Sequence, residues 1–109
     1  MNLGLKDKAA LVMASSGGIG RGVAMELARE GAKVMLFARS GEKLAQTADA
    51  IEAETGNRPL FTAGDITDPE AIAGVVARTV EEFGGLWALF NNTGGPPAGS
   101  FAQFDDAAW

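Results

Sequence analysis

The 109-residue sequence contains no cysteine, no histidine and no tyrosine. The missing cysteine excludes disulfide bonds and thiolate metal sites, and the missing histidine removes the commonest metal ligand and general base. No apolar run approaches the roughly 18 residues that suggest a membrane-spanning helix, and residues 1–7 lack the layout of a signal peptide. These absences predict a soluble, cytoplasmic protein with no metal site and no membrane partner.

Basic residues are also scarce. Nine lysines and arginines face 14 acidic residues, which gives a net charge of −5, and the basic residues are scattered along the chain. Nucleic acid is therefore disfavoured as a partner, because binding to its phosphate backbone requires a positively charged surface. Hydrophobic residues make up 47% of the sequence and charged residues 21%, which is typical of a folded domain. The length predicts a single domain over residues 1–109.

Short apolar segments alternate with segments of helical periodicity. Strands are expected at residues 8–14, 33–38, 60–63 and 86–90. Helices are expected between them, opening at a glycine turn, at Ser40 and at Asp68-Pro69, and ending at Gly31, Gly56 and Gly84. This alternation is typical of βαβ units. We therefore expect an α/β fold, a partial Rossmann-type doubly wound parallel sheet of about four strands.

The run over residues 9–20 is the most informative segment, because it combines a buried strand, a glycine turn and the opening of a helix. Glycines let the backbone approach a pyrophosphate, and the helix N-terminus offers free N–H groups and a positive dipole end. Glycine clusters also serve ordinary strand-to-helix turns. The position after the first strand of a βαβ unit favours dinucleotide binding over that alternative.

Four segments resemble motifs of the short-chain dehydrogenase/reductase family and occur in the same order along the chain. Residues 14–20 (Ala-Ser-Ser-Gly-Gly-Ile-Gly) are similar to its TGxxxGxG turn, and residues 91–94 (Asn-Asn-Thr-Gly) to its NNAG element. Residues 64–67 (Gly-Asp-Ile-Thr) follow the third strand, where the family's aspartate meets the adenine, and Arg39 follows the second strand, where the family selects its cofactor. The resemblance, which extends to members like the 3-oxoacyl-[acyl-carrier-protein] reductases, implies the N-terminal cofactor-binding half and the strand order third, second, first, fourth.

This resemblance also implies a set of cofactor ligands. They are Ser15, Ser16, Gly18 and Ile19 at the phosphates and ribose with Ala14 in the same turn, Arg39 at a 2′-phosphate, Asp65 and Ile66 at the adenine, and Asn92 and Gly94 at the nicotinamide ribose. One departure from the family pattern lies in the turn itself, where Met13-Ala14 stands in place of the usual Thr-Gly. Alanine still accepts a strand-end conformation, although its methyl group adds bulk beside the ribose.

The residues after the second strand bear on the choice of cofactor. A site for NAD commonly has a carboxylate there, which accepts hydrogen bonds from the ribose hydroxyls. Ala38 supplies none, whereas the guanidinium of Arg39 is suited to a 2′-phosphate. A solvated surface arginine is the plain alternative. Ala38 and Arg39 together favour NADP(H) over NAD(H) as the cofactor.

The missing tyrosine limits the chemistry. The family transfers hydride with the help of a Tyr-x-x-x-Lys pair and a serine, and a sequence without tyrosine cannot contain that pair. Carbonyl reduction needs a proton donor beside the hydride acceptor, and the sequence has no tyrosine, histidine or cysteine to supply it. No catalytic residue is therefore assigned. The leading hypothesis is the dinucleotide-binding half of an NADP(H)-dependent oxidoreductase acting on a carbonyl or alcohol, inactive alone and lacking its C-terminal catalytic half. The alternative is a non-catalytic, standalone half-Rossmann module that binds a nucleotide or oligomerises.

The fourth strand is expected to be an open edge, followed by a loop over residues 91–100. We expect a second copy of the chain, forming a homo-oligomer, or a C-terminal segment to pair with that edge. The first two helices should cover one face of the sheet and the third helix the other. Thr67 and Asp68 are expected to be helix caps, and Glu81 and Glu82 a solvated helix face.

Overall fold

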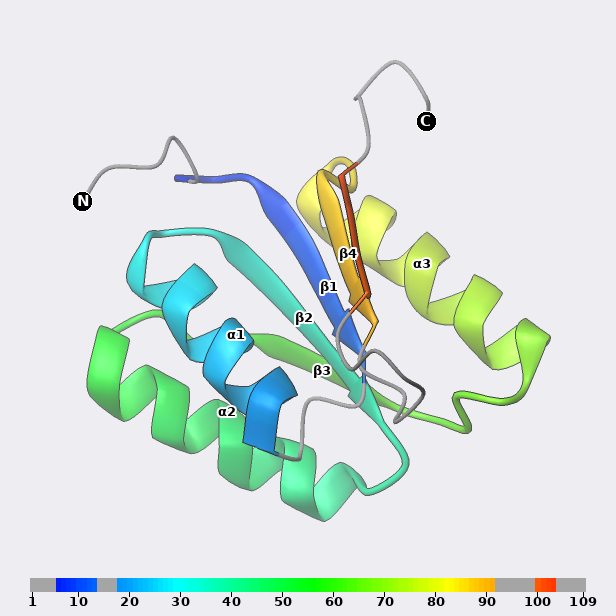
Figure 1. Ribbon diagram of the computed structural model, residues 1–109, viewed down its shortest axis with the longest axis horizontal. Helices are drawn as coiled ribbons and strands as arrows, with labels where there is room; N and C mark the ends of the chain where they lie inside the picture. The colour runs from blue at the N-terminus through cyan, green and yellow to red at the C-terminus, as the bar shows by residue number, and fades with distance from the viewer. Residues whose placement is uncertain (1–5, 14–17, 92–99, 104–109) are drawn as a thin grey trace.

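A computed structural model describes residues 6–13, 18–91 and 100–103. Over these ranges the chain forms three helices on a five-stranded sheet with the strand order β3-β2-β1-β4-β5 (Figure 1). The strands are β1 (Ala9–Met13), β2 (Lys33–Ala38), β3 (Leu60–Ala63), β4 (Ala88–Asn91) and β5 (Ser100–Gln103). The helices are α1 (Gly18–Arg29), α2 (Gly41–Thr55) and α3 (Pro69–Phe83).

The parallel part of the sheet confirms the expected fold class and strand order. β1 lies between β2 and β4 and is parallel to both, with Leu11 opposite Met35 on one side and Leu89 on the other. β3 lies parallel to the outer edge of β2. An apolar strand with no polar face can only be stable between two covered sheet faces, which is where β1 lies.

The prediction of an open edge at β4 is wrong. β5 pairs antiparallel with β4, and Asn91 lies opposite Ser100. Both residues were assigned to the loop that follows the fourth strand, but each belongs to a strand. Short antiparallel strands need only a short connection, so the chain returns along the edge that was expected to stay free.

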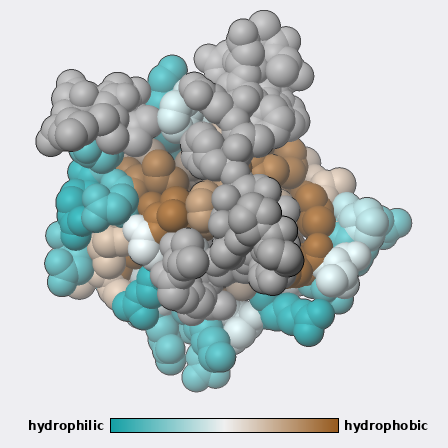
Figure 2. Space-filling model, viewed as in Figure 1, coloured by the Kyte–Doolittle hydropathy of each residue, from teal (hydrophilic) through white to brown (hydrophobic). Residues whose placement is uncertain are grey.

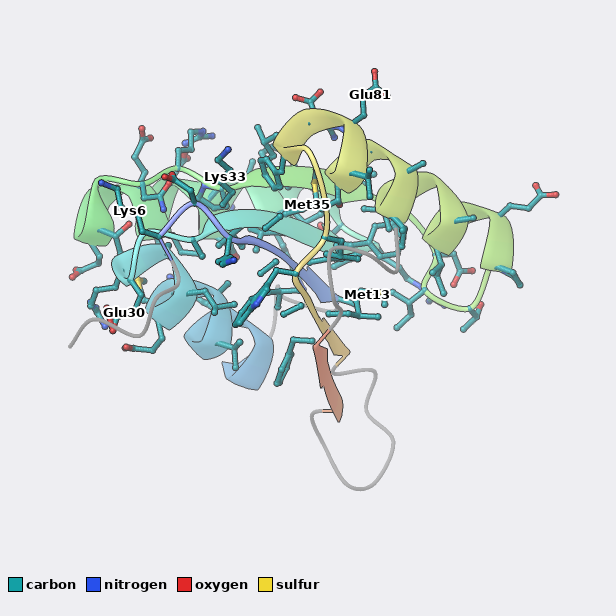
Figure 3. All side chains as sticks on the ribbon, turned by 90° about the horizontal axis from the view of Figure 1, so that it is seen from above. Lys6, Met13, Glu30, Lys33, Met35 and Glu81 are labelled. Atoms are coloured by element: carbon teal, nitrogen blue, oxygen red, sulfur yellow. The ribbon has the colours of Figure 1, made fainter. Side chains whose placement is uncertain are left out.

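Two hydrophobic clusters fill the two sides of the sheet. Ala10 and Val12 of β1 belong to the cluster under α1 and α2, and Leu11 and Met13 belong to the cluster under α3. Figure 3 shows α1 and α3 on opposite sides of the sheet. The helices contribute the buried side chains Ala24, Leu27 and Ala28 from α1, Leu44, Ala48 and Ile51 from α2, and Val75 from α3. The expected division of the helices between the two faces is confirmed.

The cap signals of α2 and α3 are confirmed. The Ser40 hydroxyl accepts a hydrogen bond from the Lys43 N–H at 3.2 Å, and an Asp68 carboxylate oxygen accepts one from the Glu70 N–H at 3.0 Å. Both helices end at a glycine in the left-handed conformation, each with a cap N–H bonded to a carbonyl of the last turn. They contain 15 residues each, and no helix in the described ranges is long and apolar enough to cross a membrane.

The third helix covers its face of the sheet alone. Four of its apolar side chains pack against the cluster under α3, called here the α3-side cluster, but stay half-buried; they are Ile72, Val76, Val80 and Phe83. The fully buried positions of α3 are Val75 and Thr79. Glu81 and Glu82 are exposed, as expected. In the view of Figure 2, hydrophobic residues gather toward the middle of the molecule and hydrophilic residues toward its rim.

Arg78 of α3 is hydrogen-bonded to β3, the strand at one edge of the sheet. Its Nη1 atom donates to the carbonyl oxygen of Phe61 at 2.8 Å and to the Thr62 hydroxyl at 2.7 Å. Strands at a sheet edge present unpaired backbone groups that can pair with another chain, and the bond from Arg78 occupies one such carbonyl. The contact also fixes the strand that leads into Gly64 and Asp65.

Gly64 packs directly against the core. A Cβ atom at this position would lie 2.7 Å from a ring carbon of Phe37, which is fully buried. We predict that Gly64→Ala lowers the free energy of unfolding by about 1–3 kcal/mol, because the ring cannot move without overpacking the core. Urea denaturation measures this quantity.

Gly74 supplies the matched control for that substitution. It lies inside α3, and a Cβ atom there would meet nothing within 4 Å. Gly74→Ala should raise the free energy of unfolding by about 0.5–1 kcal/mol through helix propensity alone. Equal effects of the two alanines would contradict the packing argument.

Candidate functional site

The carboxyl ends of the four parallel strands meet at one edge of the sheet, called here the carboxyl edge. Met13 at the end of β1 lies opposite Phe37 of β2 and Asn91 of β4, and Ala38 lies opposite Ala63 of β3. The chain leaves β1 toward β2 on one side and later reaches β4 on the other. Open α/β sheets bind ligands outside the carboxyl ends of their strands, where the strand order reverses. This edge is therefore the candidate functional site.

Half of the predicted cofactor ligands lie outside the described residues. These are Ala14, Ser15 and Ser16 after β1, and Asn92 and Gly94 after β4. Their roles stay predictions. The loop over residues 95–99 also lies outside the described ranges.

The first turn of α1 contains two further predicted ligands. Gly18 is the first residue of the helix and Ile19 the second, and β1 ends five residues before Gly18, at Met13. No acidic residue occurs in this turn. The free N–H groups and the dipole of a helix N-terminus favour an anion, so the backbone here is suited to a pyrophosphate.

Arg39 and Asp65 come together from neighbouring strands. Arg39 follows β2, Asp65 follows β3, and the Arg39 Nη2 atom lies 3.4 Å from the Asp65 Oδ1 atom. The Arg39 side chain is 72% exposed and the Asp65 side chain 49% exposed. Such a pair is weak in water, so the guanidinium stays available to a ligand at the carboxyl edge.

Thr67 holds the Asp65 carboxylate in place. The Oδ1 atom of Asp65 accepts a hydrogen bond from the Thr67 N–H at 2.8 Å and from the Thr67 hydroxyl at 2.7 Å. These two bonds hold the pKa of Asp65 below its ordinary value, and the bond from the Thr67 hydroxyl contributes more than the bond from its N–H. The positive charge of Arg39 lowers this pKa by a smaller amount. The expectation that Thr67 caps a helix is wrong, because Asp68 is the N-cap of α3 and Thr67 serves the turn instead.

Two features of this turn were not predicted from the sequence. One is Gly64, whose missing side chain lets the chain pass over the ring of Phe37, with the Gly64 N–H donating to the Ala38 carbonyl at 2.9 Å. The other is the bonding of Thr67 to Asp65. An Asp-x-Thr spacing could have indicated it, because aspartate commonly bonds the backbone two residues later. Ile66, a predicted adenine contact, is half-buried against the α3-side cluster.

The hollows described in the structure lie at the opposite end of the strands. One of about 340 Å³ is lined by residues that include Lys8, Phe83 and Trp87. A second, open hollow of about 880 Å³ lies beside Lys6 and Lys33, which Figure 3 shows away from Met13. No group of three or more acidic, histidine or cysteine side chains suited to a metal ion occurs in the described ranges.

We predict that Thr67→Val raises the pKa of Asp65 toward its ordinary value, because the variant loses the hydroxyl that contributes most to the shift. The folded state favours the deprotonated carboxylate. Asp65 therefore stabilises the fold above its unfolded pKa of about 3.9, and this contribution is lost as the pH falls through the lower folded pKa.

The carbon-13 chemical shift of the Asp65 carboxyl, followed through the acidic range, measures this pKa. Thr67→Ser keeps the hydroxyl and should leave the pKa low. A valine variant with the wild-type pKa would show that the hydroxyl does not stabilise the carboxylate.

Residues 8–109 match the family model described as short chain dehydrogenase. The chain belongs to the short-chain dehydrogenase/reductase family. This assignment agrees with the strand order and with the position of Arg39 and Asp65 at the carboxyl edge.

Two curated relatives illustrate the match to this family. The (2S)-[(R)-hydroxy(phenyl)methyl]succinyl-CoA dehydrogenase subunit BbsD of Thauera aromatica is 33% identical over 107 residues, covering 98% of this chain and 43% of that protein. The A-factor type gamma-butyrolactone 1'-reductase (1S-forming) of Streptomyces virginiae is 41% identical over 87 residues, covering 80% and 34%. The chain thus spans less than half the length of these relatives.

Two solved structures are similar in fold. L-sorbose reductase from Gluconobacter frateurii, complexed with NADPH and L-sorbose, has a TM-score of 0.81 at 37% identity, over 87% of this chain and 36% of that one. A short chain dehydrogenase from Burkholderia cenocepacia J2315, in complex with NADP, has a TM-score of 0.75 at 41% identity, over 88% and 39%. This family member therefore has the Rossmann-type nucleotide-binding fold.

Proposed function

We propose that this chain binds NADP(H) at its carboxyl edge, and that residues 1–109 are the N-terminal dinucleotide-binding part of a short-chain oxidoreductase. Its substrate class would be a carbonyl compound or the corresponding alcohol. The observation that carries the proposal is the exposed guanidinium of Arg39, which lies at the end of β2 where Ala38 supplies no carboxylate. The NADPH and NADP complexes among the structural relatives agree with it.

The described residues fit such a cofactor. The N-terminus of α1 would receive the pyrophosphate, Arg39 a 2′-phosphate, and the turn over residues 64–66 the adenine. Gly64 keeps that turn close to the sheet, because no side chain separates it from Phe37. The nicotinamide group, when bound, supplies or accepts a hydride.

Catalytic turnover requires residues beyond those that bind the cofactor. The sequence contains no tyrosine, so the Tyr-x-x-x-Lys pair that the family resemblance implies is not among its 109 residues. We infer that cofactor binding is the step these residues perform. Family membership favours this role over a standalone module unrelated to catalysis.

We predict that Arg39→Ala weakens NADPH binding by about tenfold to a hundredfold and leaves NADH binding nearly unchanged. A hydrogen-bonded guanidinium–phosphate contact contributes about 1.5–3 kcal/mol, and only NADPH has the 2′-phosphate. Calorimetric titration of each cofactor into wild type and variant measures the two dissociation constants.

The matched control is Arg29→Ala. Arg29 is an exposed arginine in the last turn of α1, away from the carboxyl edge, where it pairs with Glu26. This substitution removes the same charge from the molecule and should leave NADPH affinity unchanged. Absence of binding by wild type to either cofactor at millimolar concentration would overturn the proposed function.

A further inference from the structure

We propose that Asp65 is a specificity-determining residue that competes with the 2′-phosphate for Arg39 and so weakens the preference for NADP over NAD. This inference rests on the proposed function, because it concerns the same cofactor site. It assigns Asp65 a role that is separate from the adenine contact implied by the family resemblance.

The geometry makes Arg39 a shared cation. Among the described residues, Asp65 is the only partner of the Arg39 side chain, and the two are joined through a single pair of atoms at 3.4 Å. With both side chains largely exposed, an ion pair of this kind changes an equilibrium by about fivefold at most. It can therefore be broken by a ligand, but it lowers the affinity of any anion that needs the same guanidinium.

The Asp65 carboxylate cannot move aside as easily as the arginine. Two short hydrogen bonds from Thr67 hold its Oδ1 atom, and the preceding Gly64 is held against Phe37. Arg39 has a long and exposed side chain. When a phosphate approaches, the guanidinium must turn toward it while the negative charge of Asp65 stays beside the subsite.

Two electrostatic effects then act in the same direction. The fixed carboxylate repels a 2′-phosphate that approaches Arg39, which disfavours NADP. A carboxylate at this edge can also accept a hydrogen bond from the free 2′-hydroxyl of NAD, which favours NAD. The end of β2 has no carboxylate of its own, so Asp65, which follows β3, is the acidic group beside Arg39 in the described part of the site.

The test uses the substitution Asp65→Asn. Asparagine removes the charge but keeps an oxygen that can accept the two bonds from Thr67, so the turn is preserved. Any contact of residue 65 with the adenine is common to both cofactors. It therefore cancels in the ratio of the NAD⁺ to the NADP⁺ dissociation constant.

The matched control is Asp68→Asn. It makes the same change of charge three residues away, at the N-cap of α3, where asparagine caps as well as aspartate and Arg39 is not in contact. Arg39→Ala/Asp65→Asn reports how much of the effect passes through the arginine. Asp65→Ser is a second variant of the same site, and circular dichroism melting checks that each variant is folded.

We expect Asp65→Asn to raise the ratio of the two dissociation constants by about threefold to fivefold at low salt. The rise should be smaller at high salt and smaller in the Arg39→Ala background, and Asp68→Asn should leave the ratio unchanged. These are the results that support the inference.

The contrary results are also distinct. If wild type prefers NADP⁺ but neither Asp65 variant raises the ratio, the inference is overturned and the proposed function stands. An equal rise in Asp68→Asn overturns it as well, because the effect would then come from net charge alone. If wild type binds neither cofactor, the proposed function fails and this inference fails with it.

Discussion

The buried pairing of β1 with parallel strands on both of its edges is the constraint on which the rest of the structure depends. All five residues of β1 are buried, and its register with β2 and β4 aligns the carboxyl ends of three strands. Polar residues that follow these strands cannot enter the apolar core, so they collect outside it at one edge. The site is in this sense a consequence of the core, and any change that shifted the register of β1 would disperse its residues.

At that edge, packing and electrostatics meet in a single turn. Gly64 lies against the ring of Phe37. The carboxylate of the following residue, Asp65, contacts Arg39 and is held in place by the hydroxyl of Thr67. The core thus determines where the negative charge lies, while the positive charge sits on a long, exposed side chain. A rigid anion beside a movable cation forms a subsite whose preference between cofactors depends on the balance of the two charges.

Local signals in the sequence were sufficient for some elements. Ser40 and Asp68 were recognised as caps because each bonds a backbone N–H only two or three residues away. β5 could not be recognised in this way. Residues 100–103 (Ser-Phe-Ala-Gln) are short and only half apolar, and they form a strand because β4 offers an edge to pair with. The bonding of Thr67 to Asp65 was missed for a different reason: the hydroxyl could equally have capped α3, and the backbone geometry of the turn selected one partner.

The sequence by itself determined the α/β class, the order of the parallel strands and the presence of Arg39 and Asp65 after the second and third strands. Apolar periodicity, caps and family motifs are all carried by neighbouring residues, so they can be recognised without coordinates. Only the tertiary structure decided that Arg39 and Asp65, 26 residues apart, lie in contact, and that β4 has a neighbour on its outer edge. Both facts depend on pairing between distant strands, and the free energy of such pairing belongs to the assembled sheet rather than to any one segment.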